Sequence, residues 1–314
     1  LAPTGSDGPF RVFTPYWNRW RVAPRRAVLP APAAIPTADP LEERPLPALG
    51  ELTRGAPASR LPSGGESEAR SRLARWLCDG LSGYEAQRDE LAADGTSGLS
   101  PYLHFGCLSP NEAVERAASE NGGESWVRQL CWRDFHHQLL AAEPRLARED
   151  LRPRGDRWRD DPDALAAWKA GQTGYPLVDA GMRQLVAEGW MPGRARLVAA
   201  SFLVKHLYLD WRLGADHFAA HLVDGDLANN TGNWQWVAGT GADTRPNRVF
   251  NPTRQARRFD PEGAYVRRWV PELGDLEGSD VHEPWRLGLL RPVAYPSPIV
   301  EHDEAVRRFR DARG

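Results

Sequence analysis

Carboxylates, amides and indole rings are concentrated in one short stretch of the sequence. This stretch reads Asp224-Gly-Asp-Leu-Ala-Asn-Asn-Thr-Gly-Asn-Trp-Gln-Trp236. Its Asp-Gly-Asp start also occurs in calcium loops, but an EF-hand loop ends in a glutamate, and Gln235 stands at that place here. We therefore expect no metal site. The residue types instead suit a flat, nitrogen-rich aromatic ligand, because carboxylates and amides bind its edge and tryptophans stack on its faces.

A second motif is predicted to lie on one face of a helix. In the run Trp126-Val-Arg-Gln-Leu-Cys-Trp-Arg-Asp-Phe135, Trp126, Gln129 and Arg133 follow the spacing i, i+3, i+7, with Trp132 at the edge of the same face. An indole, an amide and a guanidinium on one stripe are unusual for a core. An ordinary amphipathic helix with an arginine reaching out to water would give the same pattern.

A third motif is a loop of small polar residues that leads into a helix. Its sequence is Gly95-Thr-Ser-Gly-Leu-Ser-Pro-Tyr-Leu-His-Phe-Gly106. The backbone amides and the hydroxyls of Thr96, Ser97 and Ser100 could hold a phosphate. A helix cap without a ligand explains these residues equally well.

The elements that must position these motifs are expected to be helical. Few segments alternate between apolar and polar residues with period two, so strands are not expected and the fold class is all-α. Long irregular loops are expected after Asp226. Helical periodicity or capping signals predict helices over 68–81, from Ser109-Pro110 onward, and over 124–142, 163–170, 179–188, 192–211 and 216–222.

The composition is that of a globular protein with 314 residues and no membrane segment. The longest apolar stretch, Leu197 to Val204, is far too short to span a bilayer. With 40 Lys and Arg against 42 Asp and Glu, any binding of nucleic acid must use local patches. The three scattered cysteines argue against disulfides or a zinc site, so we expect a cytoplasmic location. The 13 tryptophans suggest stacking surfaces or electron routes as well as core packing.

The first sixty residues differ from the rest of the chain. Twelve of the 27 prolines lie between Pro3 and Pro62, a density that favours an extended connector without regular helix. We predict a proline-rich interdomain linker over residues 1–62 and a helical domain over residues 63–314. Because the chain starts at Leu1, we expect it to be part of a longer protein. An aromatic cluster within the linker is expected to pack onto a folded neighbour: Phe10, Val12, Phe13, Tyr16, Trp17 and Trp20.

Several motifs between about Tyr84 and about Arg268 occur in the order seen in DNA photolyases and cryptochromes. They are Thr-Ser-x-Leu-Ser, Trp-Arg-Asp-Phe, Thr-Gly-Tyr-Pro-Leu-Val-Asp-Ala-Gly-Met-Arg, Ser-Phe-Leu-Val-Lys, Asp-Gly-Asp-Leu-Ala-x-Asn and Phe-Asn-Pro. Within the family, the sequence resembles class I cyclobutane pyrimidine dimer photolyases. The resemblance implies a helical domain that binds FAD. The family's preceding domain, which holds an antenna pigment, is not expected on this chain.

The resemblance also assigns roles to single residues of the cofactor site. Trp158, Trp211 and Trp234 match a chain of tryptophans that passes electrons to the flavin, with core packing as the alternative. The FAD-binding positions are Tyr84, Thr96, Ser97, Leu99 and Ser100 at the phosphates, Trp126, Arg133 and Trp190 elsewhere in the pocket, Arg196 and Asp224 as an ion pair beside the isoalloxazine, Asp226 at its imide edge, and Asn230 facing N5.

The implied reaction is the light-driven splitting of a cyclobutane pyrimidine dimer by reduced FAD, with UV-damaged DNA as partner and the protein as a monomer. Asn230, Gln129, Trp132 and Trp236 would face the flavin or the extruded lesion. Arg88 and Arg194 match positions that contact the DNA backbone. The segment from residue 245 to 269 carries seven Arg against two acids, which favours phosphate binding.

Two positions depart from the pattern of dimer photolyases. Gln129 replaces a glutamate found in many of them, and Gly193 replaces an asparagine. Six-four photolyases also have the glutamine, but they use two histidines where this chain has Gly193 and Leu197, so that reading is disfavoured. A cryptochrome-type blue-light receptor without repair activity is the alternative from another class, followed by a plain helical DNA-binding module.

Overall fold

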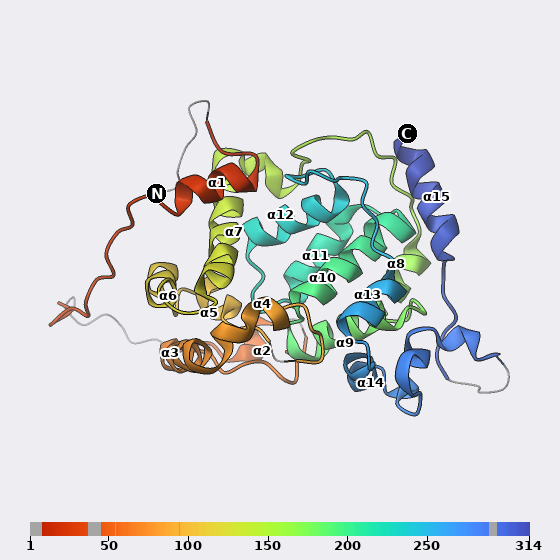
Figure 1. The fold of residues 1–314 in the computed structure, drawn as a ribbon, viewed down its shortest axis with the longest axis horizontal. Helices are drawn as coiled ribbons and strands as arrows, with labels where there is room; N and C mark the ends of the chain where they lie inside the picture. Colours follow the sequence, from red (N-terminus) through yellow and green to blue (C-terminus); the bar gives the residue numbers. More distant parts are fainter. Residues whose placement is uncertain (1–7, 37–44, 54, 94, 289–293) are drawn as a thin grey trace.

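The computed structural model describes residues 8–36, 45–53, 55–93, 95–288 and 294–314 (Figure 1). No β-strand occurs within these ranges, and the predicted all-α fold class is confirmed. The α-helices are α1 (Phe13–Trp20), α2 (Leu49–Leu52), α3 (Glu66–Arg75), α4 (Tyr84–Gln87), α5 (Ser100–His104), α6 (Pro110–Ala117), α7 (Gly123–Ala142), α8 (Pro162–Ala170), α9 (Pro176–Glu188), α10 (Gly193–Ser201), α11 (Trp211–His221), α12 (Leu227–Ala238), α13 (Pro252–Phe259), α14 (Ala264–Trp269) and α15 (His302–Arg313).

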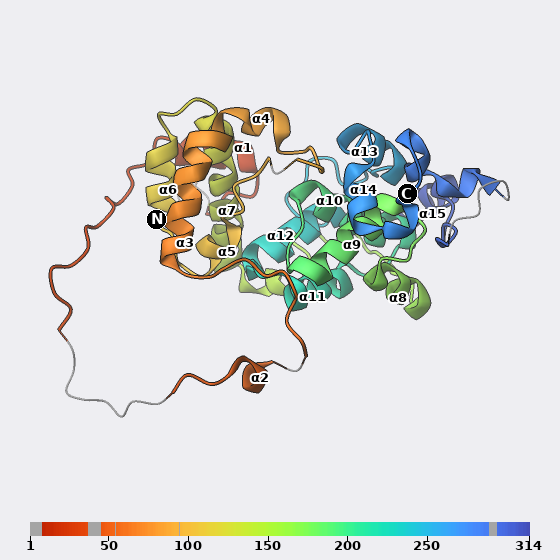
Figure 2. The ribbon, with the colours of Figure 1, turned by 90° about the horizontal axis from the view of Figure 1, so that it is seen from below.

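Two apolar cores lie on opposite sides of the α7–α12 contact. One core joins α1, α3, α6 and α7 around Phe135, and the other joins α8 to α12 with α13 and α14 around Trp168 and Phe202. The two groups of helices are separated in Figure 2. At Gly232 of α12 the groups approach so closely that a Cβ atom would lie 2.1 Å from His136 Nδ1 of α7. Glycine at this position lets the two halves pack directly against each other.

The N-terminal aromatic cluster forms a helix, so the expectation that the proline-rich region contains no regular helix is wrong. Pro15 falls in the first turn of α1, where a backbone N–H has no helical partner and proline is tolerated. The predicted packing onto a folded neighbour is confirmed, because α1 packs against α7 and Phe13 stacks on Trp132. The buried side chains of α1 are Phe13, Tyr16, Trp17 and Trp20.

The remainder of the predicted linker is largely exposed. Residues 24–36 leave the helical body as an extended chain, and the described residues from 45 to 60 come back to it through α2 (Figure 2). Residues 1–7, 37–44 and 54 of this segment lie outside the described part of the chain.

One helix prediction and one loop prediction need correction. The helix predicted over 192–211 is broken, because Tyr208 adopts left-handed backbone angles between the segment Phe202–Leu207 and α11. The loops predicted after Asp226 are interrupted by α12, α13, α14 and α15. Asp226 and Asn251 cap α12 and α13 by accepting a hydrogen bond from the backbone N–H three residues later. These caps carry a helix signal that apolar periodicity did not reveal.

Lys205 is a buried lysine in the π-helical segment Phe202–Leu207. Its Nζ donates to the carbonyl of Pro246 at 2.6 Å, and burial lowers its pKa from 10.5 to about 7. The unfolded chain therefore binds more protons than the folded chain between about pH 7 and 10.5, so stability rises with pH across this window.

Replacing Lys205 by methionine is expected to remove this rise in stability. Urea unfolding at several pH values between about 7 and 10.5 measures it, with Lys169→Met on α8 as the control for loss of a partly exposed lysine. The same pH slope in the wild type and the Lys205 variant would show that the lysine is charged when folded.

Candidate functional site

A cavity of about 680 Å³ lies between α7, α10 and α12. Its volume is within the range of about 300–1,000 Å³ typical of small-molecule sites. The residues predicted to face DNA or the lesion line it: Arg88, Gln129, Trp132, Arg194 and Trp236. The residues predicted to hold FAD line it as well: Tyr84, Thr96, Ser97, Leu99, Ser100, Trp126, Arg133, Trp190, Arg196, Asp224, Asp226 and Asn230.

Arg196 and Asp224 form a bidentate ion pair on the cavity wall. Arg196 Nη1 lies 3.0 Å from Asp224 Oδ1, and Nη2 lies 2.9 Å from Oδ2. Arg196 Nε donates to the carbonyl of Met191 at 2.9 Å. Because three of its N–H groups are held, the guanidinium presents a fixed planar cation to whatever occupies the cavity.

Asp226 offers the cavity a carboxylate that stays ionised. Its Oδ1 accepts from the backbone and side-chain nitrogens of Asn229, both at 2.8 Å, and its Oδ2 lies 2.8 Å from His137 Nε2 and 4.0 Å from His104 Nδ1. Burial raises the pKa of Asp226, but the contacts with His137 and Asn229 outweigh burial and hold the pKa well below its usual value. The group is therefore a hydrogen-bond acceptor at neutral pH.

Asn230 has one side of its amide fixed by the fold. Its Nδ2 donates to the carbonyl of Ala215 on α11 at 2.8 Å. A carbonyl can only accept, so the NH₂ group must face α11, and Oδ1 is the atom left for the cavity. Asn230 thus presents an acceptor next to the carboxylate of Asp226.

Small polar side chains and an arginine line the cavity near α5. Ser97 Oγ accepts from the backbone N–H of Leu99 at 3.4 Å, and the buried Leu99 anchors this loop in the core. Arg133 of α7 donates to the carbonyl of Leu103 at 3.5 Å. Hydroxyls and a guanidinium of this kind can bind a phosphate or pyrophosphate.

Two tryptophans provide flat walls. Trp132 stacks on Phe13 of α1, with ring centroids 3.6 Å apart and planes 3° from parallel. The guanidinium of Arg248 lies 5.1 Å from the ring centroid of Trp236. Gln129 and Gly193 also line the cavity, and Gly193 has open space where a Cβ would point. The face that the predicted lesion would meet therefore combines aromatic surface with one amide.

Arg194 is less free than its predicted role in DNA binding suggests. Its Nη2 lies 2.8 Å from Asp89 Oδ2, and its guanidinium lies 4.2 Å from the ring centroid of Phe259. A phosphate would have to share this arginine with Asp89. Arg88 instead lies over the ring of Tyr84 at 5.8 Å.

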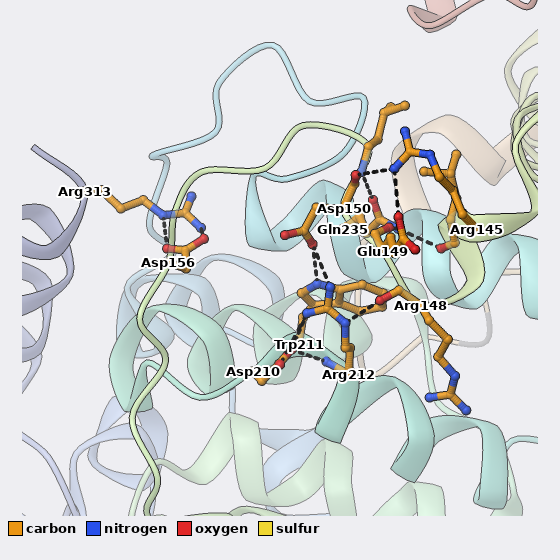
Figure 3. A network of polar contacts seen from close by, with 12 residues as sticks. Arg145, Arg148, Glu149, Asp150, Asp156, Asp210, Trp211, Arg212, Gln235 and Arg313 are labelled. Carbon is orange, nitrogen blue, oxygen red and sulfur yellow. Dashed lines mark hydrogen bonds and ion pairs between the residues drawn. The ribbon is translucent and has the colours of Figure 1, made fainter.

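The three tryptophans predicted to carry electrons lie at different depths. Trp234 lines the cavity, and Trp211 is buried in the core, where its Nε1 donates to Asp150 Oδ1 at 2.8 Å (Figure 3). Trp158 is only partly buried and contacts Tyr208. A Cβ at Gly214 would lie 2.1 Å from the ring of Trp234, so α11 and α12 pack tightly here. Trp234 and Trp211 are thus buried, and only Trp158 of the three is partly exposed.

Three polar partners of the site residues were not predicted from the sequence. His104 and His137 contact Asp226, and Asp89 contacts Arg194. The pair of histidines after Trp-Arg-Asp-Phe was a signal in the sequence for one of them. Nothing in the spacing could pair Asp89 with an arginine more than a hundred residues away.

The donors and acceptors around the cavity fit a flavin dinucleotide. A carboxylate and an amide oxygen can accept from N–H groups of a ring edge, a fixed cation can lie beside the ring, and hydroxyls with Arg133 can hold phosphates. A helical domain with this cavity has the features of an FAD-binding protein. Residues 126–313 match the family model described as the FAD binding domain of DNA photolyase. The chain belongs to the DNA photolyase family.

Individual relatives agree with this assignment. The chain is 54% identical to a deoxyribodipyrimidine photo-lyase of Streptomyces griseus, covering 100% of this chain and 70% of that protein. It is 41% identical to the Escherichia coli K12 enzyme of the same name, covering 96% of this chain and 67% of that protein. A bacterial class III photolyase from Agrobacterium tumefaciens superposes with a TM-score of 0.85 at 36% identity, covering 99% of this chain and 69% of that one.

No helix within the described ranges combines the length and the apolarity needed to cross a bilayer.

Proposed function

We propose that this chain acts as a deoxyribodipyrimidine photo-lyase, which splits cyclobutane pyrimidine dimers in UV-damaged DNA under blue light. The observation that carries the proposal is the composition of one cavity wall. The Arg196–Asp224 pair, Asp226 and Asn230 suit a flavin, while Trp132 and Trp236 in the same cavity suit an extruded pyrimidine dimer. The names of the relatives support the same activity.

The residues of the cofactor side would bind and orient the flavin. When bound, reduced FAD supplies the electron that opens the cyclobutane ring and takes it back afterwards. Asp226 would accept from the imide N–H, and Asn230 Oδ1 would accept from a protonated ring nitrogen. Since the amide nitrogen of Asn230 is held by Ala215, this side chain favours a ring nitrogen that carries a proton.

The residues of the lesion side would hold the dimer against the flavin. Trp132 and Trp236 offer aromatic faces, on which an extruded base can stack in place of its neighbours in the duplex. Gln129 can both donate to and accept from a pyrimidine edge. The basic segment 245–269, with Arg248 over Trp236, would contact the phosphates around the cavity mouth.

We further propose that residues 63–314 form the catalytic domain, that residues 1–62 connect it to a preceding part of a longer protein, and that the protein acts as a cytoplasmic monomer. The packing of α1 against α7 supports a connector that begins on the surface of the domain. Sedimentation of the purified chain with and without a damaged oligonucleotide tests the monomer.

The proposal is tested by purifying the chain, recording its absorption spectrum, and following a thymine-dimer oligonucleotide with reduced protein in light and in darkness. Copurified flavin and light-dependent repair are expected. Bound flavin without repair would favour a cryptochrome-type receptor, and repair of only a six-four lesion would favour that photolyase class.

Gln129→Glu is expected to preserve or raise dimer repair. A carboxylate forms charge-assisted hydrogen bonds of about 1.5–3 kcal/mol, against about 1 kcal/mol for the neutral amide, so lesion affinity should rise by up to about thirtyfold. Binding and repair of a thymine dimer are measured at fixed salt, because phosphate contacts also set affinity. Gln172→Glu adds the same charge at an exposed position outside the cavity and is the control. A lower affinity in the Gln129 variant alone would show that the amide donates an essential hydrogen bond.

A further inference from the structure

Tyr208 has an unusual backbone conformation. Its φ of 54° is the only left-handed value among the described residues other than glycine. It follows the segment Phe202–Leu207, and its carbonyl accepts from the backbone N–H of Arg159 at 2.9 Å. A bulky residue pays a conformational penalty in this region, so its surroundings must hold it there. The side chain is consequently fixed beside the chain segment that carries Trp158.

The phenol of Tyr208 lies between an indole ring and a carboxylate. The ring centroids of Tyr208 and Trp158 are 5.0 Å apart, and the phenol donates to Asp156 Oδ1 at 3.0 Å. Asp156 is paired with Arg313 of α15, whose Nε lies 2.7 Å from Oδ1, and both of these side chains are only 3% exposed (Figure 3). The phenol therefore has an oxidisable ring on one side and a proton acceptor on the other, shielded from solvent.

We propose that Tyr208 extends the tryptophan route by one step and becomes the oxidised residue when light reduces the bound flavin. The inference rests on the proposed function, because the oxidant is the photoexcited oxidised flavin, acting through Trp234 and Trp211 on Trp158. In the step itself, one electron passes from Tyr208 to the radical cation of Trp158, which returns to a neutral indole. The phenolic proton moves to the carboxylate of Asp156, and a neutral tyrosyl radical remains.

The charges around Tyr208 favour this step. Burial and the neighbouring Asp156 raise the pKa of Tyr208 to about 12, so the phenol still carries its proton at neutral pH. Loss of an electron makes a phenol strongly acidic, and the hydrogen bond to Asp156 gives the proton a place to go. The guanidinium of Arg313 lies 5.9 Å from the ring centroid of Trp158 and disfavours a lasting positive charge there. A neutral tyrosyl radical adds no such charge.

Tyr175 provides a matched comparison. It is also a buried tyrosine, but its phenol donates to the backbone carbonyl of Val300 at 2.9 Å, which is a poor base, and its ring packs against Phe202 and Trp285. Tyr175→Phe therefore removes a buried phenol of similar setting without touching Trp158 or a carboxylate.

The test uses the FAD-loaded chain with oxidised flavin, flashed with blue light and frozen, and compares wild type, Tyr208→Phe and Tyr175→Phe by electron paramagnetic resonance. We expect a tyrosyl spectrum in the wild type and in the Tyr175 variant. In Tyr208→Phe it should be replaced by a tryptophan radical spectrum. Time-resolved absorption should show that D₂O slows decay of the tryptophan radical in the wild type but not in Tyr208→Phe, because only the wild type transfers the phenolic proton.

The outcomes separate this inference from the proposed function. A tryptophan radical alone in the wild type, or a tyrosyl spectrum that survives in Tyr208→Phe, would overturn the role of Tyr208 and leave the tryptophan route intact. Absence of any protein radical in a flavin-loaded wild type would overturn the route and Tyr208 together. Equal unfolding midpoints of the two variants verify that folding does not explain a difference.

Discussion

Replacing Asp226 by alanine is expected to weaken FAD binding by about tenfold to a hundredfold. The variant loses a charge-assisted hydrogen bond to the imide edge, worth about 1.5–3 kcal/mol. The carboxylate is held ionised by His137 and Asn229, so the full strength of this bond is available at neutral pH. Equilibrium titration of the apoprotein with FAD, followed by flavin fluorescence, measures the loss.

The same substitution also removes the cap of α12, and this effect needs a control. Asp161→Ala removes an equivalent cap from α8, where Asp161 accepts from Ala164 N at 3.0 Å, and no residue of α8 lines the cavity. Both variants should lose about 1 kcal/mol of stability, but only Asp226→Ala should lose flavin. Equal flavin affinity in wild type and Asp226→Ala would remove this carboxylate from the cofactor site.

Trp211→Phe is expected to abolish most light-driven reduction of oxidised flavin while repair by chemically reduced protein stays nearly intact. A benzene ring is much harder to oxidise than an indole, so the route between Trp234 and Trp158 would be interrupted. Photoreduction is followed by the loss of flavin absorbance under blue light with an external reductant, and repair is measured separately after chemical reduction.

Trp168→Phe is the control for this substitution. Trp168 is also a fully buried tryptophan whose Nε1 donates a hydrogen bond, in this case to the carbonyl of Ala199 at 3.0 Å. Both variants lose an indole and its hydrogen bond, so similar losses of stability are expected. If both photoreduced at the wild-type rate, Trp211 would be a packing residue only.

The sequence predicted the site better than it predicted some of the elements that carry it. The spacing i, i+3, i+7 was enough to place Trp126, Gln129 and Arg133 on one face of a helix, and all three line the cavity from α7. Helix α12 was missed because its residues mix asparagine, glycine and tryptophan, and its stability comes from its cap and from packing in two directions.

Other features depend on the folded surroundings and leave little trace in the sequence. The break at Tyr208 falls in a run of apolar residues without glycine or proline, so no local signal marks it. The contacts of His137 with Asp226 and of Asp89 with Arg194 join helices and loops far apart in the chain. Motifs identified the residues that face the ligand, whereas the partners that orient them became visible only when the helices were placed together.

The stack of Phe13 on Trp132 determines how short a working fragment of this protein can be. A fragment that starts at residue 63 would keep every residue lining the cavity, yet it would remove the aromatic ring behind Trp132 and uncover the apolar side of α7. It would also lose the hydrogen bond from the indole of Trp20 to Asp134 and the one from Gln138 to the carbonyl of Phe10. Truncation experiments should therefore retain α1, since a cut at the proline-rich stretch would expose a buried apolar surface and promote aggregation.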